Sequence, residues 1–141
     1  MEVAGIITIH KIVEFKAKEK KPEHWVTKGK TNIGMLEVIV EKPDLELHGQ
    51  PSKYDTPIRK DSCMMEGIAR LHPFTDGNKR TSLYTAYAYL QKEHIDLDLK
   101  LIESGFLVHI ATDKSRTEEE IDTMIAEIEV YLIERIKIKN S

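Results

Sequence analysis

The sequence predicts an all-α protein, a compact bundle of about six helices with one irregular segment that forms a loop or a short hairpin. Apolar residues recur at helical spacing along nearly the whole chain. Residues that favour helix starts precede several of these stretches, as in the capping box of Thr117 and Glu120. A length of 141 residues is that of one domain, so we expect residues 1–141 to form a single domain.

The first helix is expected over residues 5 to about 18. A lysine-rich stretch overlaps its end and continues to residue 30, and we expect a solvated helix end followed by a loop. A weak attraction of phosphate groups by these lysines is the alternative. The apolar positions assigned to the inner face of the helix are Ile6, Ile9, Ile12, Val13 and Phe15.

A second helix is expected to begin at a cap formed by Thr31 or Asn32 and to end at Pro43. Its inner face is assigned to Ile33, Leu36, Val38 and Ile39. Residues 45–57 contain a glycine and two prolines that break the helical period, so this segment is expected to be a long loop or a short hairpin. The residues expected at its tip are His48, Gly49, Gln50, Pro51 and Ser52.

Four further helices are expected over residues 60–71, 77–93 and 97–112, and from Thr117 to near the end of the chain. The helix over residues 77–93 is apolar nearly all round, so we expect it to be the central one. The last helix carries apolar residues at helical spacing, namely Ile121, Met124, Ile125, Ile128, Leu132 and Ile136.

Composition and charge argue against several classes of protein. The net charge of −3 and the pI of about 6.1 disfavour wholesale electrostatic binding to nucleic acid. No apolar run approaches the roughly 20 residues that cross a bilayer, and the pattern of a signal peptide is missing. The single cysteine, Cys63, cannot form an internal disulfide, so we expect a reducing, cytoplasmic location.

Residues 72–80, His-Pro-Phe-Thr-Asp-Gly-Asn-Lys-Arg, place reactive and charged groups between two apolar helices. Pro73 prevents His72 and Asp76 from sharing one helix, so their spacing does not indicate a paired metal site. Gly77 and Asn78 open the next helix, whose unpaired N–H groups and positive dipole end favour an anion.

The side chains around this helix start fit phosphate chemistry. Lys79 and Arg80 add positive charge, and arginine can bind a phosphate with two parallel hydrogen bonds. A carboxylate beside a phosphate, here Asp76, usually serves a divalent cation such as Mg²⁺, and His72 is a natural general base. The segment therefore indicates phosphoryl or nucleotidyl transfer. The alternative is a capped turn in which Asp76 and Asn78 bond local backbone.

The segment resembles the signature of the Fic/Doc (Fido) superfamily, His-x-Phe-x-Asp/Glu-Gly/Ala-Asn-x-Arg. Its flanks, Ile-Ala-Arg-Leu and Thr-Ser-Leu, are similar to those of death-on-curing (Doc-type) proteins, and so is Gly-Met-Leu-Glu at residues 34–37 followed by Pro43. The resemblance implies the Fido fold and a transferase that uses ATP and Mg²⁺ to modify a hydroxyl of a target protein.

The resemblance also implies roles for individual residues. His72 would deprotonate the target hydroxyl, Phe74 would anchor the loop in the core, and Asp76 would hold Mg²⁺ on the nucleotide. Residues 45–57 would be the family's flap, which positions a target segment by strand-like main-chain pairing. The residues that would bind the nucleotide phosphates are Thr75, Gly77, Asn78, Lys79 and Arg80.

Two positions depart from the pattern of Fic-type adenylyltransferases, because Lys79 replaces a glycine and Leu83 replaces an arginine. The lysine fills space that a glycine leaves open, and the leucine removes one arginine that would bind phosphate. Doc-type proteins share Asn-Lys-Arg and are toxins that transfer the γ-phosphate of ATP, which favours phosphorylation of a target such as a translation factor. Gly77 is the Fic-type residue where Doc-type proteins often have alanine. Adenylylation, or a scaffold that binds nucleotide without turnover, are the alternatives.

Two further patterns are interpreted as structural. Residues 62–67 match the family's inhibitory-helix pattern Ser/Thr-x-x-x-Glu-Gly/Asn, but they lead directly into the signature, so we interpret them as core and expect a separate inhibitory partner, an antitoxin. The sequence leaves the oligomeric state open. The other histidines lack metal-ligand spacing and are expected to be ordinary surface or core residues: His10, His24, His48, His94 and His109.

Overall fold

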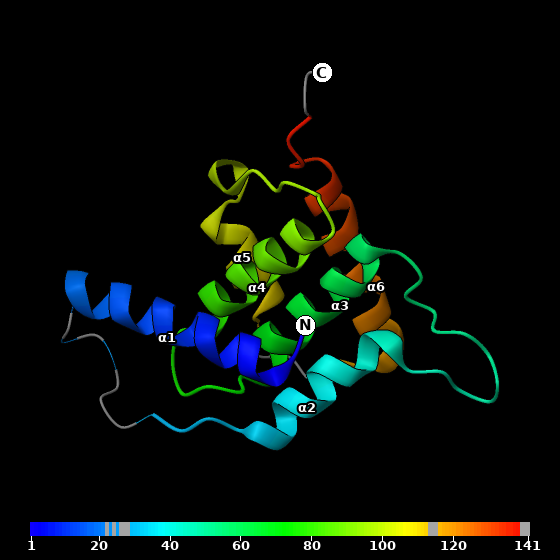
Figure 1. The fold of residues 1–141 in the computed structure, drawn as a ribbon, viewed down its shortest axis with the longest axis horizontal. Coiled ribbons are helices and arrows are strands. Elements are labelled where there is room, and N and C mark those ends of the chain that lie inside the picture. Colours follow the sequence, from blue (N-terminus) through cyan, green and yellow to red (C-terminus); the bar gives the residue numbers. More distant parts are fainter. Residues whose placement is uncertain (22, 24, 26–28, 113–115, 139–141) are drawn as a thin grey trace.

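The structure, a computed structural model, describes residues 1–21, 23, 25, 29–112 and 116–138. His24, and Lys28 of the lysine-rich stretch, lie outside the described residues. The described part is helical, with three isolated β-bridges in place of strands, which confirms the all-α class (Figure 1). In chain order the helices are α1 (Val3–Lys20), α2 (Ile33–Glu41), the 3₁₀ helix η2 (Lys42–Asp44), α3 (Pro57–Leu71), α4 (Asn78–Lys92), the 3₁₀ helix η3 (Leu99–Leu101), α5 (Ser104–Ile110) and α6 (Glu118–Ile133).

Helix α3 lies in the middle of the molecule and packs against α2, α4, α5 and α6 (Figure 1). Every residue from Asp61 to Ala69 is buried. The expectation that residues 77–93 form the central helix is therefore wrong. Helix α4 turns mostly short polar residues inward, such as Thr81 and Thr85, and keeps its tyrosines partly exposed.

The two larger of the three apolar clusters among the described residues lie on either side of α3. The larger cluster joins α3 to α4, α5 and α6, and its fully buried members include Ile110, Ile128 and Leu132. The smaller cluster joins α3 to α1 and α2 and also contains Phe74, from the loop that follows α3. Phe74 is 3% exposed, so this loop is anchored in the core. Cys63 is also buried, and burial raises the pKa of its thiol to about 11.

The inner face of α1 differs from the expected one. Ile6 and Val13 are buried, whereas Ile12 is 50% exposed and Phe15 is 65% exposed. The true inner face therefore follows Ile6 and Val13, and His10 lies between them at helical spacing.

A β-bridge between Leu97 and Ile136 changes two of the expected helices. On either side of it Asp98 N donates to Arg135 O at 2.8 Å, and Lys137 N donates to Asp96 O at 2.7 Å. This pairing holds residues 96–98 out of a helix, so the helix expected over 97–112 is split into η3 and α5. For the same reason α6 stops at Ile133, and Ile136 is not part of it.

The third expected helix starts earlier than residue 60. Thr56 accepts a hydrogen bond from Arg59 N at 3.2 Å, and Pro57 occupies the first turn. Both features stabilise a helix start, so α3 begins at Pro57.

The irregular segment between η2 and α3 contains the expected short hairpin. Gln50 N donates to Leu47 O at 2.9 Å, and the two residues between them, His48 and Gly49, have positive φ angles of 55° and 75°. Positive φ at both central positions is typical of a tight hairpin turn. The segment then packs on α6, where the Tyr54 hydroxyl bonds Asp122 at 2.9 Å.

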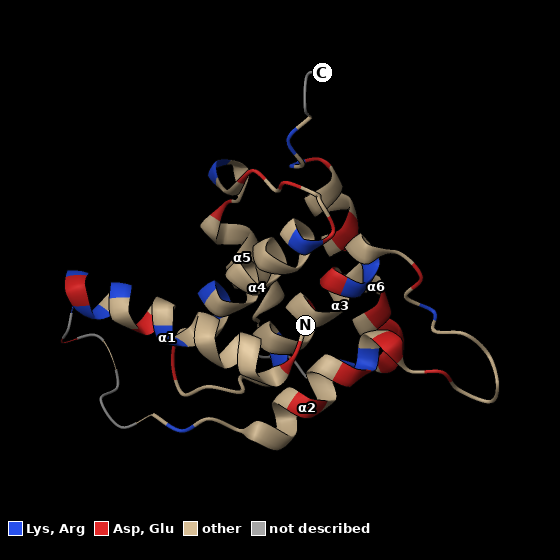
Figure 2. Ribbon diagram, viewed as in Figure 1, with Lys and Arg blue, Asp and Glu red and all other residues tan. Residues whose placement is uncertain are grey.

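Charges of opposite sign gather at two helix ends (Figure 2). The last turn of α1 carries Lys18 and Lys20, and the first turn of α6 carries three glutamates. The α6 start is the expected capping box, in which Thr117 Oγ1 accepts from Glu120 N and a Glu120 oxygen accepts from Thr117 N. No helix of the described residues is long and apolar enough to cross a membrane.

Candidate active site

The loop between α3 and α4 turns sharply at both of its ends. At the first end, His72 adopts a left-handed conformation with φ of 51°, and Pro73 prevents the helix from continuing. At the second end, Gly77 has φ of 80° and precedes the first residue of α4. The loop therefore places His72 and the start of α4 at the same end of the bundle.

The Asn78 side chain closes this loop. Its amide oxygen accepts from Phe74 N at 3.0 Å, and its amide nitrogen donates to Phe74 O at 2.7 Å. Asn78 is 6% exposed, so both bonds are shielded from water. The side chain of this residue, which the resemblance assigns to phosphate binding, is thus occupied by the loop itself, and its backbone N–H is the group left at the helix start.

Asp76 also bonds the backbone of the loop. Its Oδ1 accepts from Gly77 N at 2.8 Å. The contacts of Asp76 and Asn78 match the local backbone bonds of a capped turn, which we considered as an alternative to a phosphate site. The two interpretations are compatible, because a carboxylate on a helix-start N–H marks a place where an anion is stabilised.

The connection between α1 and α2 runs beside the loop. Thr31 forms an antiparallel bridge with Phe74, and Asn32 N donates to Pro73 O at 2.7 Å. Thr75 Oγ1 accepts from Lys30 N at 2.7 Å. The hydroxyl of Thr75 is thus bonded to this connection, although the residue still borders the pocket described next.

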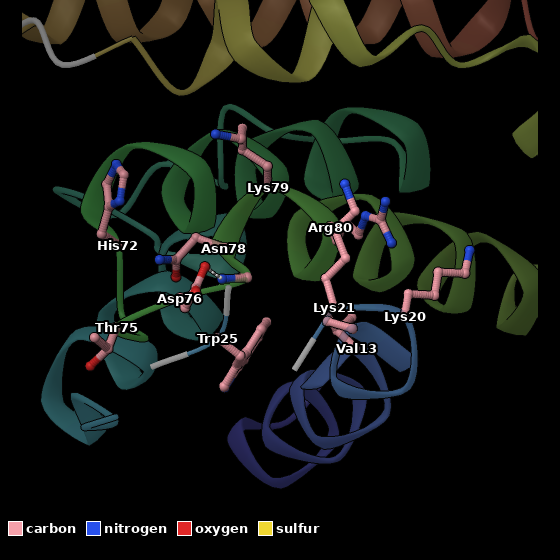
Figure 3. Close-up of a pocket in the computed structure, with 12 residues that line it drawn as sticks. Val13, Lys20, Lys21, Trp25, His72, Thr75, Asp76, Asn78, Lys79 and Arg80 are labelled. Atoms are coloured by element: carbon pink, nitrogen blue, oxygen red, sulfur yellow. Dashed lines mark hydrogen bonds between the residues drawn. The ribbon is translucent and has the colours of Figure 1, made fainter. Parts of the chain in front are cut away.

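A pocket of about 500 Å³ lies between the loop and the C-terminal half of α1 (Figure 3). The lining includes one carboxylate, Asp76, and four cations, and the side chain of Lys79 points away from Asp76 (Figure 3). His72 is exposed at one end of the pocket. The lining residues are Val13, Ala17, Lys20, Lys21, Trp25, His72, Thr75, Asp76, Gly77, Asn78, Lys79 and Arg80.

The pocket thus brings together every residue expected to be catalytic, to hold metal or to bind phosphate. It also contains Lys20 and Lys21, which supports the phosphate-attracting alternative for the lysine-rich stretch. The expected flap tip is elsewhere, because none of residues 48–52 lines this pocket and their segment packs on α6.

Two residues of the site were not anticipated from the sequence. The Trp25 ring lies so close to the loop that a Cβ on Gly77 would be 2.6 Å from Trp25 Cη2. His10 Nε2 lies 2.8 Å from Asp76 O, and its ring stacks on Phe74 with centroids 3.8 Å apart. The available signals were the single tryptophan of the chain and a histidine within the apolar face of α1.

A second hollow of about 450 Å³ lies on the other side of His72. It is formed by residues 30–33 of the α1–α2 connection and residues 72–75 of the loop. His72 borders both hollows, so a group bound in one can approach a group bound in the other at this residue.

The donor set fits Mg²⁺ bound together with a nucleotide. Asp76 is the one carboxylate among the lining residues, and the described residues contain no group of three or more histidine, cysteine or acidic ligands. Mg²⁺ is commonly held by one or two carboxylates, with phosphate oxygens and water completing its shell. The site therefore suits an ion that arrives with phosphates.

The segment that matches the inhibitory pattern has a structural role. Ser62 Oγ donates to Ile58 O at 2.7 Å within α3. Glu66 is 1% exposed and pairs with Arg70 at 2.6 Å and with Arg116 at 3.4 Å. Glu66 is thus bound to arginines outside the pocket.

The helical fold and this loop together place a helix start with neighbouring cations beside an exposed histidine. The model of the Fic/DOC family matches residues 1–90, from before α1 to near the end of α4. The chain therefore belongs to the Fic/DOC family. Proteins of this family are generally transferases that modify other proteins with a nucleotide-derived group, and they generally use ATP and Mg²⁺. The search of curated proteins and the search of solved structures give no match.

Proposed function

We propose that the protein transfers the γ-phosphate of ATP to a hydroxyl of a target protein. The observation that carries the proposal is the shared pocket, which is bordered by His72 at the end of α3 and by Asp76, Gly77 and Arg80 at the start of α4. A general base, a carboxylate and a cationic helix start are the groups that phosphoryl transfer to an alcohol requires.

In this proposal His72 takes the proton of the target hydroxyl. The hydroxyl oxygen then bonds to the γ-phosphorus, the bond from that phosphorus to the bridging oxygen breaks, and ADP leaves. Arg80 and the N–H groups at the start of α4 stabilise the negative charge of the transferred group. Asp76 would hold Mg²⁺ against the phosphates, where the ion neutralises part of their charge.

Two positions of α4, compared with the pattern of Fic-type adenylyltransferases, support phosphorylation over adenylylation. Leu83 is partly buried against the larger apolar cluster, so the cation that Fic-type adenylyltransferases have there is absent. Lys79 occupies the place of a glycine, and its side chain points away from Asp76 (Figure 3). Arg80 is then the one arginine among the described residues that line the pocket. Such a site suits a ligand with fewer phosphates bound by arginine than in Fic-type adenylyltransferases.

We also propose that the target segment lies in the hollow formed by residues 30–33 and 72–75. This hollow borders His72, whereas the segment first expected to be the flap, with His48, Gly49, Gln50, Pro51 and Ser52 at its tip, packs on α6. The Doc-type sequence features also lead us to propose a translation factor as the target and a separate antitoxin as the inhibitor.

Intact-mass measurement of candidate targets after incubation with ATP and Mg²⁺ tests the reaction. A phosphate adduct is expected with the wild type and should be lost in both H72A and D76N. H109A is the control, because it removes an exposed histidine away from the pocket. An AMP adduct would instead support adenylylation. Nucleotide binding without any adduct would support the scaffold, and an active H72A would contradict the proposed role of His72.

A further inference from the structure

His10 of α1 contacts the loop at two points. Its Nε2 lies 2.8 Å from the backbone oxygen of Asp76, and its ring stacks on Phe74 with an interplanar angle of 3°. A backbone carbonyl can only accept a hydrogen bond, so Nε2 carries the proton and donates. The stacked ring is fixed in orientation by a buried side chain, because Phe74 is itself in the core.

The bond from His10 fixes the direction of a neighbouring N–H group. Asp76 C=O and Gly77 N–H belong to one planar trans peptide, so they point in opposite directions. His10 draws the carbonyl toward α1, and the N–H therefore points away from His10 and donates to Asp76 Oδ1 at 2.8 Å. The peptide is thus held at its oxygen by His10 and at its nitrogen by the Asp76 carboxylate.

Among the described residues of α1, His10 is the one that forms a hydrogen bond to this peptide. Gly77 lacks a side chain and has φ of 80°, a region that glycine enters freely, so its own backbone restricts the orientation of this peptide less than another residue would. His10 lines a separate pocket of about 170 Å³ on the α1 side of the loop and does not line the 500 Å³ pocket. Any effect of His10 on a bound phosphate is therefore transmitted through the loop.

We infer that His10 is a positioning residue for the transfer reaction: by fixing the Asp76–Gly77 peptide, whose N–H donates to Asp76 Oδ1, it orients the Asp76 carboxylate toward the phosphates and their Mg²⁺. The inference rests on the proposed function for its catalytic consequence, but the positioning itself is a property of the protein without ligand. It assigns a role to a histidine that the reaction does not otherwise use.

The first test measures the Gly77 amide in ¹⁵N–¹H correlation spectra of the ligand-free protein. H10F keeps an aromatic ring for Phe74 but has no donor, whereas H10Q places an amide donor near the Nε2 position. The Gly77 resonance is expected to shift in H10F and to stay close to the wild-type position in H10Q. An unshifted Gly77 resonance in folded H10F overturns the inference, whether or not the protein is a transferase.

A second pair of variants covers the case in which H10F does not fold. H10Q and H10E have nearly the same shape and both lack the ring, but the ionised Glu cannot donate to a carbonyl. The Gly77 resonance is expected to differ between these two variants, and identical resonances overturn the inference.

The second test measures transfer by the same variants. The kcat of H10F is expected to fall at least about ten-fold, as when a hydrogen-bond donor to the reacting group is misplaced, while H10Q recovers most of the activity. A folded H10F with wild-type kcat and KM overturns the inference. If the wild-type protein transfers nothing, the proposed function fails, and the Gly77 resonance alone then decides whether His10 positions the loop.

Discussion

Gly77 is constrained both by its backbone and by its surroundings. Its φ of 80° lies in the left-handed region, and a Cβ would meet Trp25 Cη2 at 2.6 Å and Val13 Cγ1 at 3.2 Å. Gly49 has nearly the same φ, 75°, but nothing lies within 4 Å of the place where its Cβ would be. A substitution at Gly49 therefore adds backbone strain alone, whereas a substitution at Gly77 adds both backbone strain and steric crowding.

We expect G49A to lower the free energy of unfolding by about 1 kcal/mol, because only backbone strain is added. G77A should lower it by about 2–4 kcal/mol, because the new methyl also has to displace the Trp25 ring. Urea denaturation of both variants and the wild type measures the two values. Equal losses in the two variants would show that Trp25 does not pack against the loop.

A third variant controls the crowding. In a W25A background the nearer neighbour of the new methyl is gone and Val13 remains, so the loss caused by G77A should fall towards the value for G49A. The Trp25 fluorescence of the otherwise unchanged protein provides a second measurement, since ligand binding in the 500 Å³ pocket should alter it.

At the scale of the helices, the buried face between α3 and α4 contains polar atoms without partners. Both carboxylate oxygens of Asp61 and the hydroxyls of Thr81 and Thr85 are buried and make no hydrogen bond among the described residues. Burial raises the pKa of Asp61 well above its ordinary value, and the amino group of Met1 opposes this shift. The ionised Asp61 is therefore a destabilising group in the folded protein.

The raised pKa of Asp61 determines how stability depends on pH. The folded protein holds the Asp61 proton at pH values where the unfolded chain has lost it, so stability falls as the pH rises from the unfolded pKa through the folded pKa. We expect D61N to be more stable than the wild type at pH 8, by about 1–3 kcal/mol. The difference should shrink at a pH near the unfolded pKa, where Asp61 is protonated in both states.

Urea denaturation at a series of pH values measures this dependence. The wild type should lose stability relative to D61N as the pH rises, and D55N, at an exposed aspartate before α3, controls for the removal of one negative charge. If the difference in unfolding free energy between the wild type and D61N is the same at all pH values, burial does not raise the pKa of Asp61.

Local interactions made most helix starts predictable from the sequence, and distant contacts explain the errors. Asn32 and Thr117 cap their helices through bonds to backbone N–H groups three residues on, so a short window of sequence contains the whole interaction. The split of the helix expected over 97–112 depends instead on Arg135 and Lys137, which no local pattern reveals.

The candidate site divides in the same way. Residues 72–80 are contiguous, and their chemistry could be interpreted from the sequence because the loop brings them together by itself. His10 and Trp25 reach the loop from α1 and from the connection after it, and only tertiary packing reveals their contacts. The resemblance implies a flap at residues 45–57, but neither it nor the irregular composition of this segment shows which segment lies beside His72.

At the scale of the whole molecule, the net charge of the protein is negative, whereas the charge of the residues that line the pocket is positive. The chain has a formal charge of −3, yet the pocket is lined by four cations, Lys20, Lys21, Lys79 and Arg80, and by one carboxylate. The acidic first turn of α6 belongs to a different part of the molecule (Figure 2). A negatively charged ligand is therefore attracted to one end of the bundle, although the protein as a whole repels it.

Replacing the two lysines contributed by the end of α1 tests this local attraction. K20Q/K21Q should weaken binding of Mg²⁺–ATP about three- to ten-fold at low salt, as expected for two exposed charges near a phosphate. The matched control is K92Q/K100Q, which makes the same change in net charge at two exposed lysines that line neither hollow beside His72. The gap between the two variants should narrow as salt rises, because exposed charges are screened over about 10 Å at 0.1 M. Equal affinities at low salt would mean that the overall charge of the protein, and not the placement of Lys20 and Lys21, governs how the nucleotide binds.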